Sequence, residues 1–168
     1  MIILGLDPGS RKIGFGVVRL INRKIQYIDS GVINLERKEK LDFYQRMSLL
    51  IPEIKQIFLT HSIEQVAMES LIYVKSPTSL IKLAQARGII LSCFLDQYLG
   101  RFYEYSPNVI KSSTTGYGHA EKNQIQKFLN MILGTRDYAT DDESDALAVA
   151  VCHALHQQNK PRLKENVL

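Results

Sequence analysis

The first 35 residues contain three strand-like runs joined by short loops, and this opening restricts the possible folds more than any other feature. The runs cover residues 2–7 (IILGLD), 13–21 and 25–35, and basic residues occupy the connections. Neighbouring strands joined by such short connections predict an antiparallel meander. Gly14 and Gly16, inside the second run, indicate a place where backbone or a ligand approaches the strand closely.

After residue 40 the apolar residues follow a helical period, and later segments alternate between helix and strand. The predicted elements are, in order, a helix over 40–60, a strand over 66–69, a helix over 77–99, a strand over 102–105, a short helix over 107–112, a loop over 114–119, a helix over 120–133 and a last helix over 142–157. We expect Pro52 to bend the first helix. This order predicts an α/β fold, a mixed five-stranded sheet flanked by helices on both faces.

Length and composition favour a single domain. The chain has 168 residues, of which 45% are hydrophobic, so we expect one domain over 1–157 and a flexible, polar C-terminal tail over 158–168. No apolar run approaches the about 20 residues that a membrane-spanning helix needs. The first residues also lack a basic, then apolar, signal pattern, so we expect no membrane association and a cytoplasmic protein.

The charge balance favours a nucleic-acid partner. The chain carries 21 Lys and Arg residues against 17 Asp and Glu, a formal net charge of +4. If several of the acids gather in one pocket, the remaining surface is more basic than this number. Such a surface attracts phosphates, and a divalent ion in the pocket can bridge acids to phosphate.

Two acids stand at the ends of apolar strands. Asp7 follows IILGL and precedes Pro8-Gly9, and Glu69 ends the run VAME. Each has an ordinary alternative interpretation, because Asp-Pro-Gly is common turn chemistry and a Glu can simply emerge into solvent. A carboxylate at the end of a buried strand is costly, however, unless it is paired or binds an ion.

The start of the last helix is also acidic. Asp142 and Asp145 are three residues apart and so point to one side of a helix. The ordinary alternative is helix capping, since Thr140 and Glu143 form a capping-box pattern and acids favour a first turn. Together with Asp7 and Glu69 the two acids would form an all-oxygen site for Mg²⁺, or Mn²⁺ as a substitute. Two such ions can drive in-line attack on a phosphodiester.

Four separated segments resemble one family, the RuvC Holliday-junction resolvases, which have an RNase H-like fold. The segments are the opening ILGLDPGSRKIGFGVV, KLAQARG at 82–88, GYGHAEK at 116–122 and SDALAVAVCHA at 144–154. They follow one consistent order over about residues 1 to 156. The resemblance implies the RNase H-like version of the α/β fold predicted above.

The resemblance also implies roles for six residues. The metal-binding and catalytic acids of the family fall on Asp7, Glu69, Asp142 and Asp145, and its two functional lysines fall on Lys111 and Lys122. Lys122 would support the scissile phosphate and Lys111 would position the DNA backbone. Asp141 and Glu143 flank the third acid, so a register shifted by one residue stays open.

Further DNA contacts are expected around the start of the helix over 77–99. The family usually has an aromatic residue three positions after the strand-end Glu, and this chain has Ile72 there with Tyr73 next to it. Tyr73 either stacks on unpaired bases or packs in the core. We expect Lys75, Lys82 and Arg87 to contact the DNA as well, Lys75 and Lys82 from one helix face.

The resemblance implies an endonuclease that resolves four-way (Holliday) DNA junctions during homologous recombination and DNA repair. It would make paired symmetric nicks with 5′-phosphate and 3′-hydroxyl ends, act as a homodimer, and work beside a branch-migration helicase complex of the RuvA–RuvB type. One alternative is an ATP-binding core of the actin-like or sugar-kinase type, whose first strand also ends in Asp followed by a Gly-containing turn. Another is a non-catalytic junction-binding module.

Overall fold

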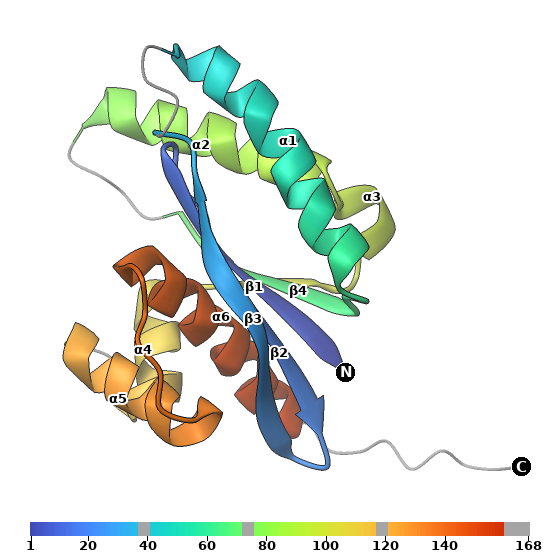
Figure 1. Cartoon of the computed structure of the whole chain (residues 1–168), viewed down its shortest axis with the longest axis vertical. Coiled ribbons are helices and arrows are strands. Elements are labelled where there is room, and N and C mark those ends of the chain that lie inside the picture. Colours follow the sequence, from blue (N-terminus) through green and yellow to red (C-terminus); the bar gives the residue numbers. More distant parts are fainter. Residues whose placement is uncertain (37–40, 72–75, 117–120, 160–168) are drawn as a thin grey trace, which may run out of the picture.

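A five-stranded mixed sheet separates two layers of helices (Figure 1). The structure is a computed structural model that describes residues 1–36, 41–71, 76–116 and 121–159. The strands are β1 (Ile2–Asp7), β2 (Lys12–Ile21), β3 (Lys24–Asn34), β4 (Gln65–Glu69) and β5 (Phe102–Tyr105). Their order in the sheet is β3-β2-β1-β4-β5. The first three strands form the predicted antiparallel meander, whereas β4 and β5 run parallel to β1.

The helices cover both faces of the sheet. They are α1 (Phe43–Thr60), α2 (Pro77–Ser92), α3 (Leu95–Tyr98), α4 (Pro107–Thr115), α5 (Lys122–Leu133) and α6 (Asp141–Gln158). Figure 1 shows α1, α2 and α3 on one side of the sheet and α4, α5 and α6 on the other. The predicted fold class is therefore confirmed. No helix within the described ranges is both long and apolar enough to cross a membrane.

Strand periodicity decides which face each side chain occupies. In β1, Leu4 and Leu6 belong to the apolar cluster under α1 and α2, whereas Ile3 belongs to the cluster under α6. Because successive strand residues point to opposite faces, Asp7 lies on the same face as Ile3. The same alternation in β4 places Glu69 on the α6 face, with Ala67 in the cluster under α6. The sheet therefore presents both strand-end acids to one helical layer.

Glycines on that face let α6 lie close to the sheet. Gly5 and Gly16 are register partners in β1 and β2. A β-carbon at Gly5 would overlap the backbone of Ala146, and one at Gly16 would lie 2.8 Å from the α-carbon of Leu147. The close approach predicted at the glycines of β2 is therefore an approach of α6 backbone.

The helix predicted over 77–99 is two helices. α2 ends at Ser92, and Phe94 has a non-helical backbone before α3 begins. Phe94 is 1% exposed and its ring packs against the rings of Phe58 and Phe102. The sequence has no helix-breaking residue at this junction, so burial of the aromatic side chain outweighs the local preference for helix.

Smaller differences concern helix ends. α1 begins at Phe43, because Asp42 caps it through a capping box with Gln45, and the helix continues through Pro52. α4 runs on to Thr115, so the predicted loop begins at Gly116, whose φ of 76° suits glycine. Most of the predicted C-terminal tail lies outside the described residues, which end at 159.

Candidate active site

Asp7 and Glu69 stand at the ends of adjacent parallel strands. β1 and β4 pair in register, with Leu6 opposite Met68, so the next residues along the two strands are the two acids. A hydrogen bond between their carboxyl groups adds to the rise that burial causes in the pKa of Asp7 and partly offsets the rise that burial causes in the pKa of Glu69. Parallel pairing thus converts two acids 62 residues apart in the chain into a carboxyl pair.

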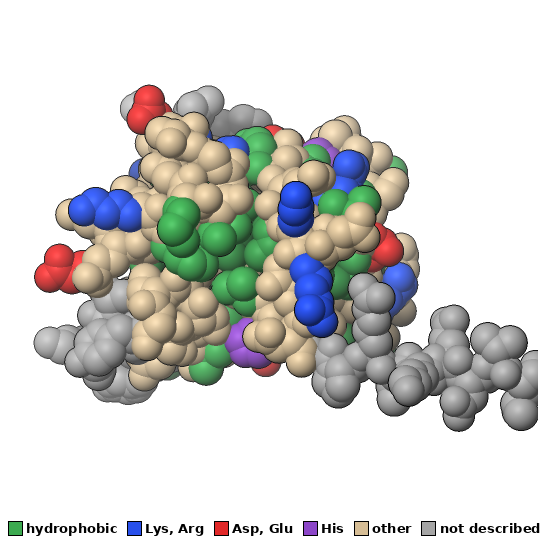
Figure 2. Space-filling model, turned by 90° about the horizontal axis from the view of Figure 1, so that it is seen from below, with side chains coloured by type: hydrophobic (Ala, Val, Ile, Leu, Met, Phe, Trp, Pro, Cys, Tyr) green, Lys and Arg blue, Asp and Glu red, His purple; other side chains and the backbone are tan. Residues whose placement is uncertain are grey.

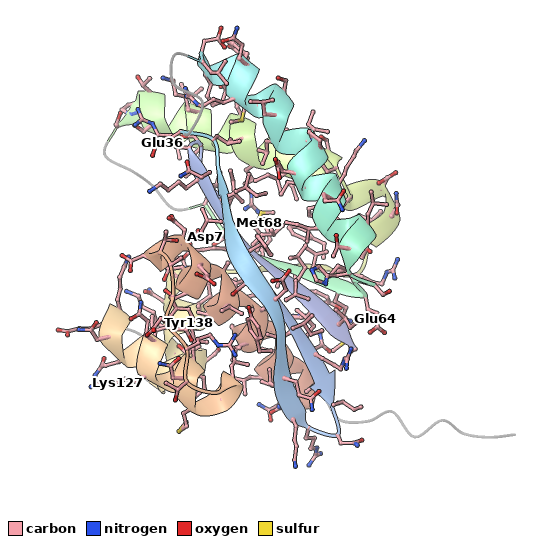
Figure 3. The ribbon with its side chains drawn as sticks, viewed as in Figure 1. Asp7, Glu36, Glu64, Met68, Lys127 and Tyr138 are labelled. Carbon is pink, nitrogen blue, oxygen red and sulfur yellow. The ribbon has the colours of Figure 1, made fainter. Side chains whose placement is uncertain are left out.

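Burial and like charge perturb this pair strongly. Loss of water around Asp7, followed by the charges of Glu69, Asp145 and Asp142, raises the pKa of Asp7 to about 7. Burial and the charge of Asp145 raise the pKa of Glu69 as well. Figure 3 shows Asp7 beside the sheet, on the side of the α6 layer. The charges of three carboxyl groups therefore add to the effect of burial on the pKa of Asp7.

The first turns of α6 supply the other two acids. Thr140 caps the helix by accepting a hydrogen bond from the backbone N–H of Glu143. Burial is the largest cause of the raised pKa of Asp145, and the charges of Asp141 and Asp142 add to it. A side chain at Gly14, the register partner of Asp7, would overlap the carbonyl oxygen of Asp142. The missing side chain at Gly14 thus lets this acidic turn lie beside the end of β1.

The acids that flank Asp142 have other partners. Glu143 is 9% exposed, and its carboxylate accepts hydrogen bonds from the Ser30 hydroxyl at 2.6 Å and the Ala139 backbone N–H at 2.8 Å. Asp141 pairs with Lys122 at the surface. These contacts favour Asp142 over both neighbours as the third acid of the site.

Two lysines face the acidic group. The Nζ atom of Lys122 lies 3.0 Å from an oxygen of Asp141 and 3.8 Å from one of Asp145. Burial raises the pKa of both Glu69 and Asp145, and the charge of Lys111, on α4, partly offsets this rise. Lys111, Lys122, Glu69 and Asp145 line one cavity of about 230 Å³. The structure therefore brings both sequence-predicted lysines to the predicted acids.

The donor set fits a hard divalent cation. Carboxylate oxygens are the ligands that Mg²⁺ and Mn²⁺ prefer. Burial, and after it the charges of three neighbouring acids, raises the pKa of Asp7. In the part of the chain that the structure describes, no three Asp, Glu, His or Cys side chains already stand in a metal-holding arrangement.

The other predicted DNA contacts have different outcomes. Tyr73 and Lys75 fall outside the described residues, and Lys82 is exposed on α2. Arg87 is only 7% exposed, and its guanidinium contacts Glu69 backbone and the Glu104 carboxylate. The structure thus does not support the expectation that Arg87 reaches DNA. A basic residue in a helical pattern gives no sign of burial, because its stem can pack while its head stays in water.

Basic side chains are distributed over the surface. Figure 2 views the molecule from below and shows Lys and Arg side chains spread across this face, with the visible Asp and Glu side chains near its outline. With a net charge of +4, the chain suits a polyanionic partner.

The sequence of this chain is similar to that of a known family over nearly its whole length. The model of the family described as "Crossover junction endodeoxyribonuclease RuvC" matches residues 3–153. Proteins of that name from Histophilus somni and Petrotoga mobilis are both 38% identical, over 99% and 91% of this chain and 86% and 93% of their own lengths. These matches favour a nuclease over the ATP-binding alternative.

Solved structures agree with the sequence matches. T. thermophilus RuvC in complex with Holliday junction substrate superposes with a TM-score of 0.83 at 25% identity, covering 94% of this chain and 95% of that one. The yeast mitochondrial Holliday junction resolvase Ydc2 has a TM-score of 0.71 at 16% identity, covering 93% of this chain and 78% of its own, which shows the shared fold. Since the family model covers nearly the whole sequence, this chain belongs to the RuvC family of crossover junction endodeoxyribonucleases.

Proposed function

We propose that this chain resolves Holliday junctions by Mg²⁺-dependent cutting of two opposing strands, in homologous recombination and DNA repair. The observation that carries the proposal is the buried Asp7, at the end of β1, whose pKa rises to about 7 beside Glu69, Asp142 and Asp145. The RuvC family is one of metal-dependent nucleases, and T. thermophilus RuvC is seen with Holliday junction substrate. Mn²⁺ is the proposed substitute for Mg²⁺.

The four acids would hold two divalent ions. Asp7 and Asp145 are the proposed central ligands, and Glu69 and Asp142 complete the set. The bound ions would activate water and stabilise the leaving oxygen, which gives 5′-phosphate and 3′-hydroxyl ends. Asp7, whose pKa is raised to about 7, would hold a cation as the ionised carboxylate.

The lysines would act on the phosphate. Lys122 is exposed and would exchange Asp141 for a phosphate at little cost, because surface ion pairs contribute little to stability. Placed beside Asp145, its charge would stabilise negative charge that develops on the scissile group. Lys111 would hold the backbone from α4. Tyr73, Lys75 and Lys82 are the other proposed DNA contacts, Lys82 from the exposed side of α2.

Symmetric cutting needs two equivalent sites. We propose a homodimer, because a junction with two-fold symmetry presents two like strands to two copies of one active site. A branch-migration helicase complex of the RuvA–RuvB type is the proposed partner, on the basis of family membership.

A cutting assay tests the proposal. Purified protein with Mg²⁺ should nick a synthetic four-way junction in opposing strands and spare a linear duplex of the same sequence, and EDTA should stop the reaction. Asp7→Asn should bind the junction and lose at least about 100-fold in cutting rate. Asp29→Asn is the matched control, because Asp29 is a strand carboxylate that pairs with His61 elsewhere. Normal cutting by Asp7→Asn would contradict the metal role, and binding without any cutting by the wild type would favour the non-catalytic alternative.

A further inference from the structure

Arg87 is a buried cation on the inner side of α2. The residue is 7% exposed, and its helix neighbours Ala86 and Ile90 are fully buried. A guanidinium is costly to remove from water unless charge and hydrogen bonds replace the water. Charged and hydrogen-bonding partners within the protein must therefore replace the water around this guanidinium.

Its guanidinium joins the ends of two strands. The Nη1 atom donates to the backbone carbonyl oxygen of Glu69 at 2.8 Å and to the sulfur of Met68 at 2.8 Å. The Nη2 atom forms an ion pair with Glu104. Met68 and Glu104 are register partners in β4 and β5, so one side chain bridges both strands at the same level. Figure 3 labels Met68, and its side chain belongs to the apolar cluster under α1 and α2.

The carboxyl group and the backbone carbonyl of Glu69 have partners in different helical layers. Its carboxyl group lines the cavity with Lys111 and Asp145 on the α4–α6 side. Its carbonyl is held from the α2 side by Arg87. β4 ends at Glu69, which is still paired with Tyr105 of β5, and the Ser70 N–H donates to the Tyr105 carbonyl at 2.9 Å. Arg87 thus adds a side-chain hydrogen bond to the backbone carbonyl at the last residue of the strand, the residue that carries the carboxyl group.

We propose that Arg87, oriented by Glu104, is a positioning residue that fixes the main chain of Glu69 and thereby aims its carboxyl group at Asp7 and Asp145. The inference rests on the proposed nuclease function and adds a residue that acts through Glu69. It also replaces the expected DNA contact of Arg87 with an intramolecular one. Displacements of a catalytic group by about 1 Å can cost about 100-fold in rate, so a clamp on its backbone has a measurable effect.

Three variants separate this role from DNA contact and from simple stabilisation. Arg87→Met removes charge and hydrogen bonds while keeping a long side chain. Arg87→Lys keeps the charge but loses the fork that reaches both strands, and Glu104→Gln keeps an acceptor without the charge. Arg101→Met is the control, because Arg101 is an exposed arginine just before β5 whose side chain contacts the Gln97 carbonyl and the Tyr98 ring.

The expected result is a loss of rate without a loss of DNA binding. Cutting at saturating junction should fall about 10- to 100-fold in Arg87→Met and less in Arg87→Lys and Glu104→Gln. Junction Kd, measured with Asp7→Asn added to every variant, should stay within about twofold, with an unchanged salt dependence. Without DNA, the Mg²⁺ concentration that gives half of the rise in melting temperature should increase severalfold, because Glu69 is a proposed ligand. Arg101→Met should match the wild type in all three measurements.

Other outcomes would overturn the inference. A weaker Kd together with a salt slope reduced by about one would make Arg87 a phosphate contact. A lower melting temperature with wild-type rate and Mg²⁺ midpoint, in the two milder variants, would leave only a structural ion pair. Absence of cutting by the wild type would reject the proposed function, and the Mg²⁺ midpoints would then still decide for or against the clamp.

Discussion

Gly14 lies directly beneath Asp142: a β-carbon at Gly14 would overlap the backbone carbonyl oxygen of Asp142. Gly14 is also the register partner of Asp7 in the antiparallel pair of β1 and β2. The acids of β1 and of α6 therefore meet across a glycine. The close approach of α6 to the sheet decides how near Asp142 and Asp145 lie to Asp7.

Gly14→Ala should damage both stability and activity. The added carbon must push the first turn of α6 away, which should lower the free energy of unfolding by about 1–3 kcal/mol. Displacing the two α6 acids should lower the junction-cutting rate at least about tenfold. Urea denaturation and the cutting assay measure the two effects. Gly88→Ala, on α2 with open space around it, should keep or raise stability, and a wild-type cutting rate in Gly14→Ala would show that the site tolerates a shifted α6.

The metal-free protein should lose stability as pH rises from about 4 to about 7. Over this range the folded state retains a proton on Asp7, whose pKa is about 7, whereas the unfolded state, with a pKa of 3.8, releases it. The raised pKa values of Glu69 and Asp145 act in the same direction. In EDTA, the free energy of unfolding should be on the order of 1–3 kcal/mol lower at pH 8 than at pH 5.

Two comparisons isolate the cause of this pH effect. Asp7→Asn should flatten much of the dependence, because the amide carries no titrating proton. Mg²⁺ should raise the stability of the wild type more at pH 8 than at pH 5, since ions compete with the shared proton. An Asp7→Asn profile as steep as that of the wild type would place the titrating group elsewhere.

Lys122→Ala should reduce cutting about 10- to 100-fold with little change in stability. Its ion pair with Asp141 is exposed on both sides, so the pair contributes about 0–1 kcal/mol to folding. Single-turnover cutting at saturating junction and thermal melting are the measurements. Lys127→Ala, on the exposed part of the same helix, is the control, and an equal loss in both variants would indicate general attraction to DNA rather than action at the cut phosphate.

Asp142→Asn should lower the cutting rate, whereas Glu143→Ala should lower the stability. Asp142→Asn removes a proposed metal ligand, so cutting should fall at least about tenfold while the fold persists. Glu143→Ala leaves the Ser30 hydroxyl and the Ala139 N–H without their acceptor, which should cost about 1–3 kcal/mol of stability. Chemical denaturation and cutting at saturating Mg²⁺ separate the two effects. If Glu143→Ala instead stays stable and loses cutting, the third ligand is Glu143.

Residues whose role depends on a neighbour were harder to predict than residues with a strong local pattern. Gly14 indicated close approach because a glycine inside a strand has few other uses, and α6 backbone fills that space. The intramolecular contacts of Arg87 were not predicted, because helical spacing does not reveal that Glu104 and the Glu69 carbonyl lie on the inner side of α2. The break at Phe94 was also missed, since an aromatic cluster formed across distant segments outweighs local helix preference.

By itself the sequence determined the order of the elements, the alternation that points Asp7 and Glu69 to one face, and the helix start that carries Asp142 and Asp145. These properties follow from side-chain periodicity and capping, which act over a few residues. Only the tertiary structure decided that the acids of β1, β4 and α6 lie close together. It also decided that Glu143 accepts structural hydrogen bonds and that Arg87 is buried. Those outcomes depend on strand register and on how closely α6 approaches the sheet, and both are set by contacts between residues far apart in the chain.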